Sequence, residues 1–488
     1  MIMEATSEQA FNAYLKLAQA KLRPQGVGLA EPQPIQLLET RSMELRRLVD
    51  GIEESPELSE LVTATATAFP CETVVHRFRG SQEVPVQRED IKNFFRRSRC
   101  YMSLFSGEDV DAKAALESFR GVFRKEEIQI RYLVAPGGIN FQLDADVVEF
   151  ERFKLRRFSS EELEEIFQND VNDIFYQSNT LSRSDLMFSE PYWFIDVLGF
   201  ESREEGVAKS DEINHDFLPS VEEEFGAFPK TVASVLDPFI LCDWDSFDPL
   251  SPAFEFNVPF ILEISNDLRD EPRRVPEIVP MCGGDGDYDI DWDVELDNGQ
   301  LNSFQRFIAD MDSILTRLRS AQSKWRFLDA ALLFLRYSFV SKGRQQLLSH
   351  ITVLEALIGE DKAGQAKLKQ RLACLLGSSE QERKAIKKSF EEIYDLRSRL
   401  VHGDEEMLNQ KTSTEHLRQA RTLARQTLVW FLHYLEHVLD ATRNNENLPT
   451  REDLLSVLDL NTESRERVKH LLKILPPDFP RTSDWLDQ

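Results

Sequence analysis

Cysteine is scarce in this chain, and it is not arranged for a structural role. The five cysteines are Cys71, Cys100, Cys242, Cys282 and Cys374. They are scattered, odd in number and form no CxxC pair, so neither a zinc site nor a disulfide framework is expected. No other cluster of ligating residues indicates a metal or a cofactor, and none is expected. Scattered thiols fit the reducing conditions of a cytoplasm.

Long apolar runs are also missing. A membrane-spanning helix needs about 18 consecutive apolar residues, whereas the best runs here, AALLFL and TLVWFL, are far shorter. The opening segment, MIMEATSEQAFNAYLKLAQ, places an acidic residue ahead of any apolar stretch, and it lacks the apolar core of a signal peptide. We therefore expect a soluble, cytoplasmic protein that does not contact a membrane.

Basic residues are outnumbered, and the imbalance is confined to one part of the chain. The 488 residues carry a net charge of −27. Residues 301–488 hold about 29 basic and about 26 acidic residues, or about +3, so residues 1–300 carry about −30. An acidic surface repels a phosphate backbone at long range, whereas a neutral or mildly basic surface tolerates it. RNA contact is therefore expected only in the second half.

Length and composition predict two or three folded domains. Hydrophobic residues make up 41% of the sequence, and there are 33 phenylalanines, which is ample for packed interiors. Periodicity predicts helices at 5–22, 35–50, 56–68 and 89–98 and strands at 73–78, 128–134, 147–155, 192–200 and 258–264. A capping box beginning at Ser159 opens a further helix, SEELEEIFQNDVNDIF. We expect residues 1–300 to form an acidic mixed α/β region, in one unit or two subdomains, with a sensing or regulatory role.

The boundary segment is MCGGDGDYDIDWDVELDNGQ, residues 281–300. Its acidic residues alternate with apolar ones, and such oxygen-rich spacing invites a calcium interpretation. The EF-hand pattern fails, because counting from Asp285 places Ile290 where glycine is needed and Leu296 where glutamate is needed. A period of two instead predicts a strand with one apolar face and one solvated acidic face. A calcium-regulated adaptor is an alternative that rests on this segment alone.

From residue 301 onward the pattern is helical. Apolar periodicity predicts helices at 302–318, 323–341, 343–359, 363–376, 379–402 and 412–442. Helices of that length with short links indicate a bundle, which we assign to residues 301–445. Residues 446–488 are expected to add short helices, within about 449–475, and a C-terminal tail. The predicted fold class is α+β, a mixed α/β N-terminal region followed by an all-α helical bundle.

One segment of the helical part combines residue types that perform chemistry: FEEIYDLRSRLVHG, residues 390–403. An arginine and a histidine held beside one phosphodiester suffice to cleave RNA without a metal. Their spacing is not selective, because Arg465 and His470 repeat it and Arg344 and His350 differ from it by one residue. The surrounding sequence therefore has to distinguish the pairs.

Arg397 continues an apolar stripe marked by Phe390, Ile393 and Leu400. A guanidinium at that place must be paired or must line an interface or cavity, because burying it alone is costly. Glu355 in ITVLEALIG is the obvious partner, since it borders the apolar stripe of its own helix. A purely structural bridge between the two is an open alternative to catalysis. The two interpretations overlap, because such a bridge also orients a catalytic arginine.

His402 lies on the line of Asp395 and Ser398, seven and four residues before it on the same helix. Gly403 predicts the left-handed cap that ends this helix. Five helical steps turn the chain by about 140°, so one copy does not aim Arg397 and His402 squarely at one phosphate. Two copies facing across a twofold axis would form a cleft with two arginines and two histidines. Catalysis would therefore require a homodimer.

Three segments in this order, FLDAALLFLRYSF, HITVLEALIG and IYDLRSRLVHG, closely resemble the Apea-like branch of the HEPN domains. The resemblance spans roughly residues 320–440 and does not cover residues 1–300. An acidic or mixed α/β region ahead of such a domain looks like the usual arrangement in bacterial relatives. The resemblance implies an all-helical, usually dimeric HEPN fold that often acts as a metal-independent RNase in anti-phage or toxin–antitoxin systems.

Carried onto this sequence, the resemblance implies catalytic roles for Arg397 and His402. The polar residue after the motif arginine, often Asn or Asp in other branches, is Ser398 here. Glu355 takes the place of the acid in the LEAL segment, with a supporting role, and Asp395 and Tyr394 are further supporting candidates. The implied reaction is attack by the RNA 2′-hydroxyl, which leaves a cyclic 2′,3′-phosphate and a 5′-hydroxyl. The histidine would move protons, and the arginine would stabilise the phosphate.

The expected function is a bacterial endoribonuclease that cleaves RNA, with tRNA among the candidate substrates, as an anti-phage or abortive-infection effector. It would form a homodimer through the HEPN bundle, and residues 1–300 would respond to a trigger such as a phage protein. The alternative is a non-catalytic HEPN module that dimerises and docks a partner.

Overall fold

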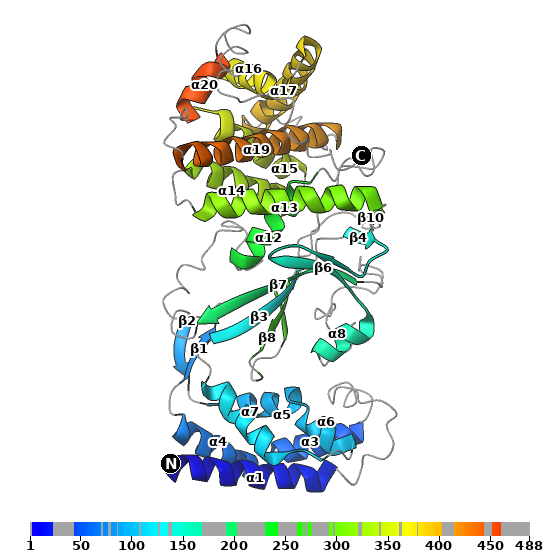
Figure 1. The fold of residues 1–488 in the computed structure, drawn as a ribbon, viewed down its shortest axis with the longest axis vertical. Coiled ribbons are helices and arrows are strands. Elements are labelled where there is room, and N and C mark those ends of the chain that lie inside the picture. The colour runs from blue at the N-terminus through cyan, green and yellow to red at the C-terminus, as the bar shows by residue number, and fades with distance from the viewer. Residues whose placement is uncertain are drawn as a thin grey trace.

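The computed structural model places its helices and strands in three parts along the long axis of the molecule (Figure 1). A helical part contains the N-terminus, a β-sheet lies in the middle, and a second helical part lies beyond the sheet. The described residues are 2–22, 43–69, 72–76, 80–84, 86–106, 109–124, 127–134, 139–167, 192–202, 230–242, 261–266, 268, 272–275, 292–295, 298–320, 325–340, 343–360, 364–377, 379–402, 414–443 and 451–459.

The N-terminal part packs its helices around aromatic side chains. The helices are α1 (Ile2–Leu22), α3 (Met43–Glu53), α4 (Pro56–Ala68), α5 (Arg88–Arg97), α6 (Cys100–Ser106) and α7 (Ala112–Arg124). Ser55 begins α4 by accepting a hydrogen bond from the Leu58 N–H at 3.3 Å, which satisfies a donor of the first turn. The fully buried rings of Phe11, Tyr14, Phe94 and others form the core of this part, so it holds a hydrophobic cluster of its own.

Three of the four helices predicted here, at 5–22, 56–68 and 89–98, are confirmed by α1, α4 and α5. The prediction at 35–50 is confirmed over 43–50 by α3, and residues 35–42 lie outside the described part of the chain. The sequence patterns did not predict α6 and α7.

The central sheet is antiparallel, with strand order β5-β6-β7-β3-β8-β9. Its strands are β3 (Glu127–Val134), β5 (Val147–Glu149), β6 (Phe153–Phe158), β7 (Tyr192–Ser202), β8 (Ile261–Ser265) and β9 (Arg273–Val275). Tyr132 of β3 stands opposite Val197 of β7 and Glu263 of β8. The run at 147–155 is two strands rather than one, because the Phe150 N–H donates to the Phe153 carbonyl at 3.0 Å and closes a turn between β5 and β6.

Alternation along the strands divides the sheet into two buried faces. Ile130, Tyr132 and Val134 of β3 join the largest core, whereas Leu133 joins a small cluster on the other face. That cluster includes Leu163 of α8 (Ser160–Phe167). The capping box predicted at the start of α8 is present, since Ser159 and Glu162 exchange hydrogen bonds at 3.0 and 3.2 Å.

Two further strand pairs lie outside this sheet. β1 (Glu72–His76) pairs antiparallel with β2 (Gly80–Val84). β10 (Trp292–Glu295) pairs parallel with β4 (Ile139–Gln142). The strand predicted in the alternating acidic segment is therefore confirmed over 292–295, and residues 276–291 lie outside the described residues.

The second helical part agrees closely with its predicted helices. It contains α13 (Asn298–Ser320), α14 (Arg326–Val340), α15 (Gly343–Ile358), α16 (Gln365–Leu376), α17 (Glu380–Val401), α19 (Thr414–Arg443) and α20 (Arg451–Asp459). Ser379 and Glu382 form a capping box at the start of α17. Since helices dominate and the main sheet is antiparallel, the predicted α+β class is confirmed.

The largest core runs across residue 300 and joins the sheet to the helical bundle. Between them lies α12 (Lys230–Ile240), which the sequence patterns did not predict. Asp237 of α12 is 1% exposed and forms ion pairs with Arg319 of α13 and Arg336 of α14. A buried charge with two partners ties this helix to the bundle.

Candidate functional site

The helix that carries the predicted site, α17, lies at the end of the bundle far from the sheet (Figure 1). Phe390 and Ile393 are its fully buried residues, and Leu396 and Leu400 pack half-buried against the same core. Arg397 lies where this stripe continues, with 30% of its side chain exposed. The guanidinium therefore lies at the boundary between core and solvent.

Arg397 forms an ion pair with Glu355 of the neighbouring helix α15. Its Nη2 lies 3.3 Å from Oε1 and 3.4 Å from Oε2 of that carboxylate. Tyr394 donates a hydrogen bond from its hydroxyl to Glu355 Oε1 at 3.3 Å, and its ring centre lies 5.5 Å from the guanidinium carbon. We call these three side chains the Arg397 cluster. The bridge that the sequence suggested is present.

The Arg397 cluster leaves part of the guanidinium available. Arg397 Nε and Nη1 make no hydrogen bond or ion pair with any residue that the structure describes. A guanidinium carries five N–H donors in a planar fork, and both oxygens of Glu355 face a single nitrogen. Donors therefore remain for a second anion, such as a phosphate.

Burial, followed by the negative charge of Glu355, raises the pKa of Tyr394 above its ordinary value. The phenol therefore stays protonated and keeps donating to the carboxylate. Glu355 itself is 29% exposed, and its neighbours Leu354 and Leu357 are buried. The two buried leucines fix the helix, so the carboxylate has a defined position at the edge of the core.

His402 follows the last helical residue of α17 and is exposed. Its backbone N–H donates to the Ser398 carbonyl at 3.0 Å, which closes the final turn. Gly403, the predicted cap residue, lies outside the described residues. The imidazole is thus presented to solvent at the end of the helix whose previous turn carries Arg397.

The remaining supporting candidates do not converge on His402. Asp395 accepts a hydrogen bond from Gln365 Nε2 of α16 at 3.0 Å, so it links two helices. Ser398 is half-buried, and within the described residues its hydroxyl makes no hydrogen bond. The structure brings together Arg397, Glu355 and Tyr394, but it joins neither Asp395 nor Ser398 to the histidine by a side-chain contact.

The two alternative arginine–histidine pairs have different surroundings. His350 is fully buried on α15, and both of its ring nitrogens are without a hydrogen-bond partner among the described residues. Burial, and then the charges of Arg421 and Arg425, hold its pKa well below the ordinary value. Such a neutral, enclosed imidazole has no access to RNA. Arg465 and His470 lie outside the described residues.

Sequence reasoning missed three buried arginines in the bundle. Arg371, Arg421 and Arg425 have exposures of 1% or less. The two on α19 alternate with buried apolar residues such as Ala424 and Leu428. The available signal was arginine at apolar-stripe positions, the same signal that identified Arg397.

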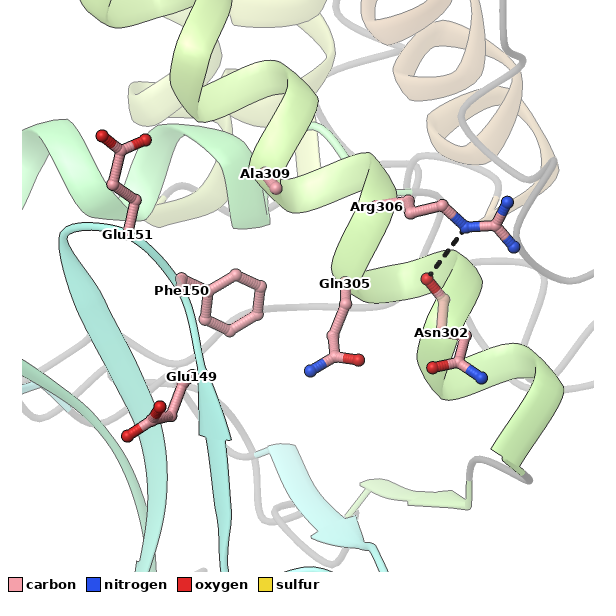
Figure 2. A pocket seen from close by; sticks show the side chains of 7 residues that line it. All are labelled: Glu149, Phe150, Glu151, Asn302, Gln305, Arg306 and Ala309. Atoms are coloured by element: carbon pink, nitrogen blue, oxygen red, sulfur yellow. Dashed lines mark hydrogen bonds between the residues drawn. The ribbon is translucent and has the colours of Figure 1, made fainter.

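A pocket of about 600 Å³ lies between the turn that follows β5 and the first half of α13. Figure 2 shows the Phe150 ring pointing toward Gln305, with the carboxylates of Glu149 and Glu151 on either side of that strand turn. Arg306 points away and donates from Nε to the Asn302 carbonyl at 3.4 Å. None of the predicted site residues lines this pocket.

Among the described residues, no three His, Cys, Asp or Glu side chains come together as a metal ion would require. No helix in the described ranges has both the length and the apolar character of a membrane span.

Comparison with family models, with curated proteins and with solved structures gave no match for this chain.

Proposed function

We propose that this protein is a metal-independent endoribonuclease of the HEPN type, acting in the bacterial cytoplasm as an anti-phage effector under the control of residues 1–300. The observation that carries the proposal is the placement of Arg397. It is half-exposed and held by Glu355 through one nitrogen, and it lies one turn before the exposed His402 on the same helix. The resemblance of residues 320–440 to Apea-like HEPN domains adds to it.

Arg397 is suited to bind the phosphate that is cleaved. Its Nε and Nη1 face no partner among the described residues, and two N–H groups of a guanidinium match two phosphate oxygens. Glu355 and Tyr394 restrict the side chain to one region. The negative charge that develops on the phosphorane would be stabilised by a positioned cation, the largest contribution in many enzymes.

His402 would transfer the protons. The RNA 2′-oxygen attacks phosphorus while its proton passes to a neutral imidazole, and the bond from phosphorus to the 5′-oxygen breaks as that oxygen gains a proton. The products are a cyclic 2′,3′-phosphate and a 5′-hydroxyl. Two imidazoles, one from each copy in a dimer, would serve as base and acid.

A dimer through the end of α17 is supported by its apolar surface. Val401, which directly precedes His402, is 55% exposed. Leu396 and Leu400 are only partly covered by the core of their own chain. Covering such a surface with its own copy about a twofold axis would bring two Arg397–His402 pairs together.

The distribution of charge agrees with this assignment. The bundle and the residues after it carry about +3, whereas residues 1–300 carry about −30. RNA would meet the bundle first, since the acidic part repels it. The acidic part is therefore better suited to restrain or trigger the nuclease than to hold its substrate.

The test is cleavage of total RNA and tRNA by the purified protein, alone and with candidate phage proteins. Arg397→Ala and His402→Ala are each expected to slow cleavage by about 10²- to 10⁴-fold. Products should carry cyclic 2′,3′-phosphate ends. Lys388→Ala, at an exposed position on the same helix, is the matched control and should cleave like the parent. Equal activity of all four proteins would exclude the proposal.

A non-catalytic module is the second candidate, and the Arg397 cluster itself favours it. An arginine bridged to Glu355 and lying near the Tyr394 ring already has an acidic partner and a ring contact within its own chain. In that case His402→Ala would leave cellular protection and partner binding intact. Sedimentation would still report a dimer, but no variant would change the rate of RNA cleavage.

A further inference from the structure

A second pocket lies beside the Arg397 cluster, where the ends of α15 and α16 meet α20. It is open to solvent and has a volume of about 540 Å³. Its lining includes Glu355, Glu360, Leu368, Arg451, Glu452 and Leu455. Leu368 and Leu455 belong to the buried core, with exposures of 2% and 1%, so they give the pocket an apolar floor. Because Glu355 lines the pocket and also holds Arg397, the two sites share one carboxylate.

The charges around this pocket are balanced. Glu355 pairs with Arg397, and Glu360 pairs with Lys367 at 2.7 Å and with Arg371 at 3.0 Å. A pocket lined by free carboxylates would attract a cation, but these two are already neutralised. The two other charged residues of the lining, Arg451 and Glu452, carry opposite charges that cancel. A neutral ligand with both donors and acceptors therefore fits better than a free cation or anion.

Arg451 is fixed in place by the end of α15. Its Nε donates to the Leu357 carbonyl at 3.1 Å, and its Nη2 donates to the Ala356 and Gly359 carbonyls at 3.0 and 2.6 Å. The guanidinium lies over the Phe327 ring, 5.0 Å from its centre. Within the described residues, Nη1 makes no hydrogen bond. The pocket is thus lined by an arginine that is anchored to the end of α15 and keeps one nitrogen for a further partner.

Glu452 supplies the complementary acceptor. It is exposed, and it forms no ion pair with any residue described in the structure. It lines the same pocket as Arg451, at the start of α20, and a carboxylate accepts two parallel hydrogen bonds. Guanine is the nucleobase whose edge presents two adjacent donors, N1–H and the 2-amino group, followed by the O6 acceptor.

We propose that this pocket binds a guanine base of the RNA, next to the phosphate that Arg397 binds. Glu452 accepts from N1–H and the 2-amino group, Arg451 Nη1 donates to O6, and the leucine floor packs under the ring. Recognition of single-stranded RNA generally uses bases turned out of the stack and bound by their edges. The proposal rests on the proposed ribonuclease function and names the base that the enzyme selects.

The test measures base recognition separately from cleavage. The full-length protein is titrated by calorimetry with GMP, AMP, CMP and UMP, whose phosphate is common, so differences in affinity report the base. GMP is expected to bind about 10- to 100-fold more tightly than the others. Glu452→Gln should remove most of this preference. Glu380→Gln, an exposed acid at the start of α17, is the matched control and should retain it.

The outcomes separate the two proposals. Preferred binding of GMP by a protein that never cleaves RNA keeps the pocket and overturns the nuclease. Cleavage that depends on Arg397 and His402 but shows no guanine at the cut sites, together with equal affinity for the four nucleotides, overturns the pocket and keeps the nuclease. Loss of GMP preference in Glu380→Gln as well as Glu452→Gln also overturns the assignment of the base to this pocket.

Discussion

Helix α12 lies on the side of the bundle that faces the sheet, and α17 lies at the far end (Figure 1). The ion pairs formed by these two helices differ in how completely their charges are engaged. Beside the sheet, Asp237 is 1% exposed and accepts hydrogen bonds from Nε and Nη2 of Arg336, both at 2.7 Å, and a further one from Arg319. At the far end, Arg397 reaches Glu355 through one nitrogen at 3.3–3.4 Å, and these side chains are 30% and 29% exposed.

The difference separates a structural bridge from a bridge that can exchange its partner. A buried carboxylate shared by two guanidinium groups has no alternative ligand, so its loss leaves charges without compensation. A half-exposed pair with long contacts contributes little to stability. In the proposed function, its arginine would accept a phosphate without first losing a strong bond. The Arg397 cluster thus keeps donors for a second partner, although it is built from the same residue types as the Asp237 cluster.

Removing the acid from each cluster gives the largest expected contrast. Asp237→Asn is expected to lower the free energy of unfolding by about 3–5 kcal/mol, because it leaves Arg319 and Arg336 without a counter-charge in a buried position. Glu355→Gln should lower it by about 0–1 kcal/mol, since water replaces the lost contact. Urea denaturation followed by circular dichroism measures both values.

Asp440→Asn is the control for this pair of variants. Asp440 is half-exposed and pairs with Arg317 on the bundle surface, so its loss should resemble that of Glu355 rather than that of Asp237. Equal losses for the variants at 237 and 355 would remove the distinction between the clusters. That result would favour a purely structural role for Arg397.

The buried imidazole of His350 makes the free energy of unfolding depend on pH. Since the pKa of His350 lies well below its ordinary value of 6.5, the unfolded chain binds a proton at this residue more readily than the folded chain. Stability from the neutral imidazole is fully present above pH 6.5 and is lost as pH falls below it. The loss relative to a variant without this group is about 1.4 kcal/mol per pH unit.

Unfolding of the parent protein and of His350→Leu between pH 8 and pH 5 measures this loss. The difference between the two free energies should be constant above pH 6.5 and should then shift in favour of the variant. Subtraction removes the contribution of His433, whose pKa burial also lowers. Parallel curves over the whole range would show that His350 titrates alike in both states, and that the buried arginines do not affect it.

The bundle was largely predictable, because its helices have long and regular apolar stripes. The segments predicted at 343–359 and 379–402 correspond to α15 and α17, with ends that differ by no more than a few residues. The Arg397–Glu355 pair followed from the same stripes, since two charged residues at apolar positions of adjacent helices have few partners to choose from. Local periodicity carries this information.

The junction with the sheet was not predictable in the same way. Helix α12 contains Pro238 in its interior, which is a signal against a helix in a sequence pattern. Its partners are distant, since Asp237 meets Arg336 across 99 residues, and just after the helix the Cys242 carbonyl accepts from Arg425 across 183. No pattern within one segment records such contacts, so the partners of the buried arginines are known only once the helices are assembled.

The smallest predicted effect is a coupling energy between two side chains of the Arg397 cluster. Tyr394→Phe removes a hydrogen bond of 3.3 Å to Glu355 and should lower the free energy of unfolding by about 0.5–1 kcal/mol. Combining Tyr394→Phe with Glu355→Gln gives a double-mutant cycle, and a coupling energy of about 0.5 kcal/mol is expected. If the cluster serves catalysis, the tyrosine variant should also cleave RNA several-fold more slowly, because Glu355 then holds Arg397 less firmly. A coupling energy without a change in the rate of RNA cleavage would show that Tyr394 stabilises the fold and does not position Arg397 for catalysis.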